Sequence, residues 1–312
     1  MSARALPRRE TLRTGASLVL GASALLLAPR IRAAARGTVQ VAYAGSLVQV
    51  MNTQIGPGFE RATGYRFAGL PGGAQALAEE IASGQVRADV FVSAATGPDE
   101  LLLRRPAHGA IAWYAPFASS PLVIGYNPRS RFAAALRRGP WYRVMAEPGF
   151  RLGRTDPRLD PKGALTVRFA EAAARYYHDP RLVQQVLGSP ENPAQVFPEE
   201  TLVARLQAGQ LDAGFFYRSE AVAARLPYLT PPAALTFGAL YTVALPAGGP
   251  DPAGAIAFVR YLLGPAARAM LVRDGFTLET PKAVTTDPAT VPAALRALLH
   301  VEVGPRAPAK GR

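Results

Sequence analysis

Short apolar runs alternate with segments of helical periodicity along most of the chain. The runs TVQVAYAG (38–45) and ADVFVSA (88–94) predict strands, and AQALAEEIASG (74–84) repeats its apolar positions at helical spacing. Run 88–94 shows no polar alternation, which is typical of a strand covered by helices on both faces. The alternation predicts an α/β fold with mostly parallel strands, in which residues 88–94 lie in the interior of a sheet.

A second α/β series begins near FASSPLVIGYNP (117–128) and extends to the run LDAGFFY (211–217). The chain then returns to a strand pattern at 237–246, followed by helical patterns at 253–275. Such a return indicates two lobes with a cleft between them, and a chain that passes from one lobe to the other twice. We assign residues 36–118 together with 239–312 to the first lobe, and residues 119–238 to the second.

Residues 1–35 have the pattern of an export signal rather than of a folded segment. A basic stretch is followed by about 14 apolar residues and by small residues suited to cleavage. The apolar run is shorter than the roughly 20 residues that span a bilayer. Arg8 and Arg9 resemble a twin-arginine signal, although Pro7 and Thr11 depart from its usual form. We therefore expect a periplasmic or extracellular protein.

Charge and composition exclude several classes of function. The formal net charge is +13, of which residues 1–35 carry +5, but the arginines are scattered, so we expect a solvated surface and no nucleic-acid partner. The chain has no cysteine, and His108, His178 and His300 lie far apart. Neither a zinc site nor a Ser-His-Asp site is expected, and we predict no cofactor and no free metal ion.

Small residues open several predicted helices directly after strands, where unpaired backbone N–H groups can bind an anion. These starts are Gly45-Ser46, the GGAQ segment at Gly73 and Ala74, Gly163, and the helix that follows Tyr217. Four such starts facing one cleft would favour a small dianion. The alternative for Ser46 is that it only caps its own helix.

The order and spacing of several segments resemble the periplasmic binding proteins for molybdate and tungstate that serve ABC transporters. The resemblance spans roughly residues 38–285. Its marks are AYAGSL, GGAQALAEEI, ADVFVSA, FASSPLVIGYNP, WYRVMAEPGFRLGRTDPRLDP, PEETLVARLQAGQLDAGFFYRSEA, and Gly275 with Phe276. It implies a two-lobed periplasmic binding fold, with two mixed or parallel sheets, helices on both faces of each sheet, and a hinge of two strands.

The resemblance also implies a set of ligand-binding residues. From the first lobe these are Ser46 and the backbone near Gly73 and Ala74; from the second they are Asp160, Gly163, Val196 and Tyr217. Asp160 is similar to a carboxylate that reaches the metal centre of the bound oxyanion. Molybdenum and tungsten accept oxygen ligands beyond four, whereas the sulfur of sulfate does not, so a carboxylate would reject sulfate.

The chain departs from this pattern at three places. Phe216 stands where a second carboxylate is usual, and Glu220, in the next helix, is a possible substitute. The GGAQ segment lacks a common serine. Lys162 could pair with Asp160, attract an anion, or lie exposed in a loop. Asp156 precedes a proline, and we interpret it as a turn residue without a ligand role.

The sequence therefore predicts a monomeric, non-enzymatic binding component of an ABC importer, which closes over molybdate or tungstate and presents it to a membrane permease. The alternatives are a protein that binds another small anion, such as sulfate, phosphate or an organic acid, and a sensor or scaffold that binds no ligand. A hydrolase with Ser46 as nucleophile is a further alternative, but neither a GxSxG motif nor a suitably placed histidine supports it.

Overall fold

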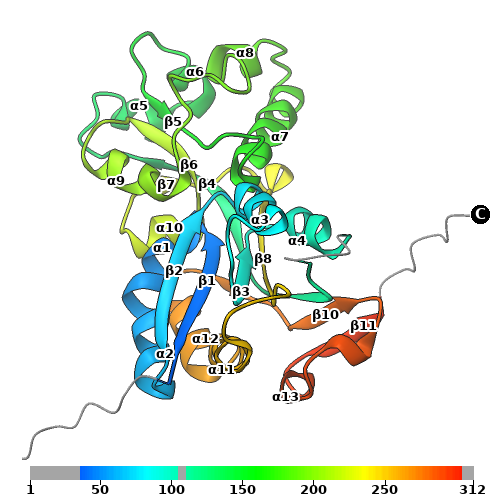
Figure 1. Cartoon of the computed structure of the whole chain (residues 1–312). Coiled ribbons are helices and arrows are strands. Elements are labelled where there is room, and N and C mark those ends of the chain that lie inside the picture. The colour runs from blue at the N-terminus through cyan, green and yellow to red at the C-terminus, as the bar shows by residue number, and fades with distance from the viewer. Residues whose placement is uncertain (1–35, 105–109, 304–312) are drawn as a thin grey trace, which may run out of the picture. The chain divides into compact units, whose positions relative to one another are not determined.

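The computed structural model describes residues 36–104 and 110–303, so the predicted export signal lies outside the described residues. The described chain alternates strands and helices, as the sequence pattern predicts (Figure 1). Its strands form two sheets that share one long strand, β4 (Trp113–Tyr126). The fold is therefore α/β with two lobes, one built on each sheet.

The first sheet has the strand order β11-β10-β4-β8-β3-β1-β2. β1 is parallel to both β2 and β3, whereas β8 is antiparallel to β3 and β4, so the sheet is mixed. The short strand β9 also pairs with β4. The bounds are β1 (Thr38–Ala44), β2 (Arg66–Gly72), β3 (Val90–Ser93), β8 (Gly238–Ala244), β9 (Thr277–Leu278), β10 (Lys282–Thr285) and β11 (His300–Val303).

Strand β3 lies between β1 and β8, and all of its residues are buried. The prediction that residues 88–94 form an interior strand is therefore confirmed. Within the first sheet, the prediction of mostly parallel strands holds only for β1, β2 and β3 and for the pair β10 and β11. β8 is antiparallel to β3 because the chain enters it on returning from the second lobe. Apolar periodicity does not reveal the direction of a strand.

The second sheet is smaller and uses the far end of β4. Residues 122–126 of β4 pair with β6 (Ala213–Tyr217) on one side and with β7 (Tyr228–Leu229) on the other. β5 (Leu152–Gly153) adds a parallel partner to β6. The chain thus passes between the sheets within β4 and again between β7 and β8, which gives the two-strand connection expected of a hinge.

Helices pack around both sheets and bury their apolar faces against them. Those of the first lobe are η1 (Gly45–Leu47), α1 (Val48–Val50), η2 (Met51–Ile55), α2 (Gly56–Thr63), α3 (Ala74–Ser83), α4 (Thr96–Leu103), α11 (Pro252–Leu262), α12 (Pro265–Arg273), η5 (Pro288–Thr290) and α13 (Ala293–Arg296). Those of the second lobe are α5 (Ala133–Arg138), α6 (Trp141–Met145), α7 (Pro161–Tyr176), α8 (Leu182–Val186), η3 (Glu199–Thr201), α9 (Leu202–Gln207), α10 (Arg218–Ala223) and η4 (Ala233–Leu235).

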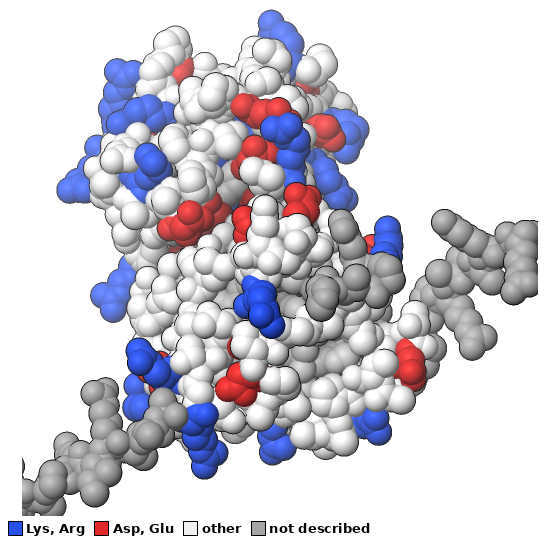
Figure 2. Space-filling model, in the orientation of Figure 1, with Lys and Arg blue, Asp and Glu red and all other residues white. Residues whose placement is uncertain are grey.

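Charged side chains are distributed unevenly over the face drawn in Figure 2. Lysines and arginines are spread over it, mostly near its outline, without a continuous basic patch. Aspartates and glutamates gather across the middle, between the upper and lower parts. On this face the pattern agrees with the expected solvated basic surface, and it draws attention to acidic residues at the junction of the lobes.

Candidate functional site

The two lobes touch at the start of α3. The N–H of Ala76 donates to the carbonyl oxygen of Leu159 at 3.2 Å, which joins the first lobe to the segment before α7. A Cβ atom at Gly73 would lie 2.5 Å from the same oxygen. Because real Cβ atoms do not approach backbone oxygens so closely, only glycine fits this contact.

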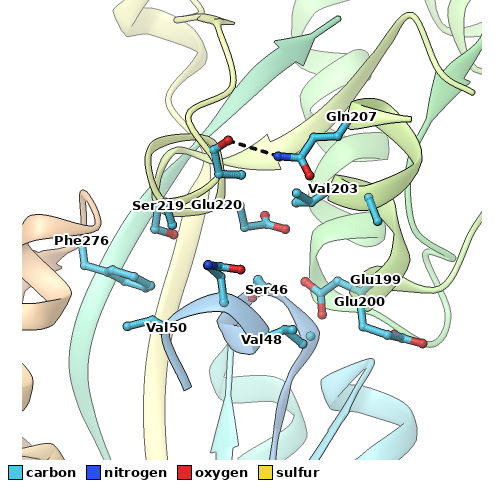
Figure 3. A pocket seen from close by; sticks show the side chains of 15 residues that line it. Ser46, Val48, Val50, Glu199, Glu200, Val203, Gln207, Ser219, Glu220 and Phe276 are labelled. Carbon is cyan, nitrogen blue, oxygen red and sulfur yellow. Dashed lines mark hydrogen bonds between the residues drawn. The ribbon is translucent and has the colours of Figure 1, made fainter. Parts of the chain in front are cut away.

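Two cavities open at this junction, and Glu199 and Glu200 line both of them. One, of about 220 Å³, is also lined by Ser46, Ser219 and Glu220. Figure 3 shows the side chains of Glu199 and Glu220 directed into the space beside Ser46. The other, of about 460 Å³, has in its lining a set of predicted site residues: Gly73, Asp160 and Val196. The structure therefore gathers residues from distant parts of the sequence around one junction.

Asp160 is the N-cap residue of α7. Its Oδ1 atom accepts hydrogen bonds from the backbone N–H of Lys162 (2.8 Å) and of Gly163 (3.3 Å), and from the hydroxyl of Thr155 (2.8 Å). Its Oδ2 atom is buried and has no hydrogen-bond partner. One oxygen thus stabilises the helix start, while the other remains available to a ligand.

Lys162 is fully buried, so the interpretation of an exposed loop lysine is wrong. Nor does its side chain bond to Asp160. The ammonium group donates to both carboxylate oxygens of Glu220 (2.8 and 2.9 Å) and lies 3.2 Å from Oε1 of Glu199. Burial lowers the pKa of Lys162, but the charges of Glu220, Glu199 and Asp160 raise it more, so the net pKa is raised and the side chain stays cationic.

Glu220 was the possible substitute for the carboxylate that is usual at the position of Phe216, but both of its oxygens already accept hydrogen bonds within the protein. Besides binding Lys162, its Oε2 atom accepts from the N–H of Tyr217 at 2.7 Å and so caps α10. Burial raises the pKa of Glu220, although Lys162 opposes this. Phe216 is fully buried, with its ring 5.7 Å from the Lys162 ammonium. Glu220 therefore holds Lys162 in place rather than presenting a free carboxylate.

Glu199 is a site residue that the sequence reasoning missed. It is 4% exposed, and neither of its oxygens accepts from an N–H or hydroxyl group, although the Lys162 ammonium lies 3.2 Å from Oε1 and the Asp160 carboxyl group lies within hydrogen-bonding reach. Burial raises the pKa of Glu199 well above its usual range, and the charge and hydrogen bond of Asp160 raise it further, whereas Lys162 opposes the rise. The segment PEETL counted only toward the family resemblance, and nothing in it signals that the first glutamate faces inward.

Two tyrosines add hydroxyl groups to the site. Tyr217 and Tyr241 are fully buried, and burial raises the pKa of both well above 10. The Tyr241 hydroxyl donates to Oγ of Ser46 at 3.3 Å, whereas the Tyr217 hydroxyl has no partner. Both phenols therefore stay protonated: the Tyr217 hydroxyl is free to donate to an anion, and the bond from Tyr241 leaves the Ser46 hydroxyl hydrogen free to donate. Tyr241 was not predicted from the sequence.

The structure does not leave all four predicted helix starts free to bind an anion. Gly163 gives its N–H to Asp160, and Glu220 caps α10. Ser46 lies in η1, which continues without a break through α1 and η2 into α2, so it stands in the first turn of a long helical segment (45–63) that no side chain caps. Of the four predicted starts, those at Gly45-Ser46 and at Ala74, after Gly73, therefore have no side-chain cap.

Val196, another predicted residue, lies on a bridge beside Arg154 and lines the larger cavity. Asp156 forms a turn, as predicted: its Oδ1 atom accepts from the N–H of Arg158 at 2.8 Å. Among the described residues that line the two cavities there is no histidine, so Ser46 has no imidazole base there.

Unpartnered polar atoms are concentrated at this site. Among the described residues, seven buried side-chain nitrogen or oxygen atoms lack a hydrogen-bond partner, and five of them belong to Asp160, Glu199, Tyr217 and Ser219. Buried polar atoms are normally satisfied, so such a concentration indicates a place where a bound molecule completes the hydrogen bonds. Three carboxyl groups and one ammonium group surround that place. We call the four residues that carry them, Asp160, Lys162, Glu199 and Glu220, the carboxylate cluster.

A two-lobed α/β fold with polar groups converging between the lobes defines a solute-binding protein. The family model described as bacterial extracellular solute-binding protein matches residues 39–277. The chain belongs to this family. The resemblance inferred from the sequence is therefore confirmed at the level of the family.

Relatives cover different shares of the chain. A protein of Haloferax volcanii, provisionally named as an ABC transporter molybdenum-binding protein, is 35% identical over 228 residues, which cover 72% of this chain and 67% of the relative. A solute-binding protein of Halobacterium salinarum is 30% identical over 84% of this chain and 90% of its own length. The molybdate/tungstate-binding protein of Pyrococcus abyssi is 29% identical over 38% of this chain and 40% of its own length.

Solved structures share the fold at low identity. The periplasmic molybdate-binding protein of Azotobacter vinelandii superimposes with a TM-score of 0.61 at 18% identity, covering 77% of this chain and 99% of that one. The sulfate-binding protein of Mycobacterium tuberculosis reaches a TM-score of 0.55 at 17% identity, over 85% and 94% of the two chains. Because proteins with different ligands share this fold, the ligand has to be argued from the site itself.

Proposed function

We propose that this protein is the solute-binding component of an ABC importer and that it binds molybdate or tungstate between its lobes. The observation that carries the proposal is the pair of buried carboxyl groups, Asp160 and Glu199, whose free oxygens lie at a site that also offers donors. The donors are the uncapped helix starts at Ser46 and Ala74 and the hydroxyls of Ser46 and Tyr217.

The carboxylates decide between classes of oxyanion. A carboxylate beside sulfate, which carries no proton at neutral pH, places two acceptors against each other and repels the anion. A carboxylate beside molybdate or tungstate can bind the metal centre as an additional oxygen ligand, while the donors bind the oxygens of the anion. The same groups therefore attract one class and reject the other, which is how a site achieves selectivity.

The names of the relatives from Haloferax volcanii and Pyrococcus abyssi support the same ligand class. The family is described as extracellular, which supports export by a signal in residues 1–35. The remaining parts of the proposal are the lobes at 36–118 with 239–312 and at 119–238, hinge closure over the ligand, a membrane permease as partner, and a monomer in solution. An empty sensor or scaffold would have no use for the unpartnered atoms.

Calorimetric titration of the purified protein with molybdate, tungstate and sulfate tests the proposal. We expect tight binding of the two metal oxyanions and none of sulfate. Asp160→Ala should weaken binding by at least about 100-fold, since changes outside the first ligand shell alone cost about 10–100-fold. Asp160→Asn, which retains an acceptor for the cap of α7, separates this loss from any effect on folding.

Asp179→Ala is the matched control, because the Asp179 side chain also serves a turn, accepting from the N–H of Arg181 at 3.1 Å, but lines neither cavity. The control should bind as the unmodified protein does. Binding of sulfate together with the metal oxyanions, or no response to either change at Asp160, would contradict the proposal.

A further inference from the structure

Three carboxyl groups surround the proposed site of a dianion. If all three were charged and free they would repel the ligand, so their roles must differ. Asp160, Glu199 and Glu220 all lie within the carboxylate cluster, yet their hydrogen bonding differs. Glu220 makes three hydrogen bonds through its two oxygens, to the Lys162 ammonium group and to the N–H of Tyr217. Glu199 accepts none from an N–H or hydroxyl group.

We propose that Glu199 is the second carboxylate that binds the metal centre of the oxyanion together with Asp160, and that Glu220 does not take this role. The inference rests on the proposed function and identifies the residue that gives the site its selectivity. Glu199 comes from the turn η3, whereas the position that the family resemblance marks for a carboxylate is in strand β6 and holds Phe216. The acid is thus supplied from a different element.

The placement of Glu199 between the lobes supports this role. A Cβ atom at Gly45 would lie 2.9 Å from Oε2 of Glu199, so the carboxylate reaches the first lobe directly beside Ser46. Glu199 also lines both cavities, including the one that contains Asp160. A group at this position meets any ligand held between the predicted donors of the first lobe and Asp160.

Lys162 makes two carboxylates compatible with an anionic ligand. Its ammonium group lies 3.2 Å from Oε1 of Glu199 and is fixed by Glu220 from the other side. The positive charge offsets the repulsion between Glu199, Asp160 and the incoming oxyanion. Glu220 and Lys162 therefore act as positioning residues, and Glu199 keeps its oxygens for the ligand.

The test compares three isosteric variants, Glu199→Gln, Glu220→Gln and Glu171→Gln, by titration with tungstate, molybdate and sulfate. We expect Glu199→Gln to weaken binding of the metal oxyanions by about 100-fold and to admit sulfate, because the group that repels it is gone. Glu171, which is exposed on α7 and lines neither cavity, is the matched control and should leave both affinity and selectivity unchanged. Glu220→Gln should still exclude sulfate.

Gain of sulfate binding is a readout that a merely structural role would not produce, and thermal unfolding of each variant checks that it folds. Glu199→Asp, which keeps the charge but shortens its reach, should weaken metal oxyanion binding while still excluding sulfate. Unchanged binding in Glu199→Gln, or admission of sulfate by Glu220→Gln instead, would overturn the inference while the proposed function stands. If the unmodified protein binds neither metal oxyanion, the proposed function fails as well.

Discussion

Two buried acids of the second lobe, Asp212 and Glu199, show how differently a carboxylate can be used in one fold. Asp212 accepts hydrogen bonds from the hydroxyl of Ser130 (2.8 Å), from the N–H of Arg151 (2.8 Å) and from its guanidinium group (2.9 and 3.0 Å). Glu199 lies beside the cation Lys162 but accepts no hydrogen bond from an N–H or hydroxyl group. Complete hydrogen bonding marks Asp212 as structural, whereas the oxygens of Glu199 have the free acceptor capacity that its proposed ligand-binding role requires.

The pKa values of these acids reflect the same difference. Burial acts to raise the pKa of Asp212, but the hydrogen bonds from Arg151 and Ser130 lower it more, so its pKa is depressed. Burial and the charge of Asp160 raise the pKa of Glu199. An acid whose pKa is raised by its own surroundings reduces stability when ionised, and such groups persist mainly where function requires them.

The largest effect should follow from removing the cation of the carboxylate cluster. Lys162→Met leaves Glu220 and Glu199 buried without a counter-charge, so we expect a loss of about 3–5 kcal/mol in the free energy of unfolding. Chemical denaturation followed by circular dichroism measures it. Arg151→Met is the comparison in the other region: half of that side chain is exposed, so we expect about 1 kcal/mol. Equal losses in the two variants would contradict the comparison.

A smaller effect is expected for Asp212→Asn, which breaks the satisfied network. At neutral pH we expect a loss of about 2 kcal/mol in the free energy of unfolding, since buried donors lose their acceptor. Because the folded pKa is depressed, the contribution of Asp212 is present above the unfolded value of about 3.9 and disappears as pH falls through the folded pKa. Denaturation curves across this range should converge in acid; a difference that persists or grows there would contradict the assignment.

The smallest expected effect concerns closure. The Asp212 network lies entirely within the second lobe, whereas the ligand site also needs the contact at Gly73 with Leu159. Gly73→Ala should weaken tungstate binding about tenfold, or about 1.4 kcal/mol, because the added Cβ resists close approach of the lobes. Gly97→Ala is the control, as nothing lies within 4 Å of its Cβ position. Equal affinity in both variants would exclude a closed form with this contact.

The sequence predicted the elements of the fold well because their signals are local. Apolar periodicity located β1, β3, α3 and α7, and the return of the chain at 237–246 indicated two lobes. The antiparallel direction of β8 was not visible, since strand direction depends on partners that are distant along the chain. Long-range pairing leaves no trace in the spacing of apolar residues.

The site was predicted less completely, for a similar reason. Asp160 and Tyr217 stood out because they follow or precede recognisable motifs at the ends of elements. The inward orientation of Lys162 depends on Glu220, which is 58 residues away, so the sequence left its role open. Glu199 lies in a short turn whose orientation is set only when η3 packs against Gly45 of the first lobe.

The central claim is that carboxylates of this protein bind the metal centre of the oxyanion. The X-ray absorption spectrum of molybdate bound to the protein, recorded at the molybdenum edge, tests it most directly. We predict more oxygen neighbours than the four of the free anion, with fewer in Asp160→Asn and in Glu199→Gln. A bound anion that keeps the tetrahedral spectrum of free molybdate would contradict the account.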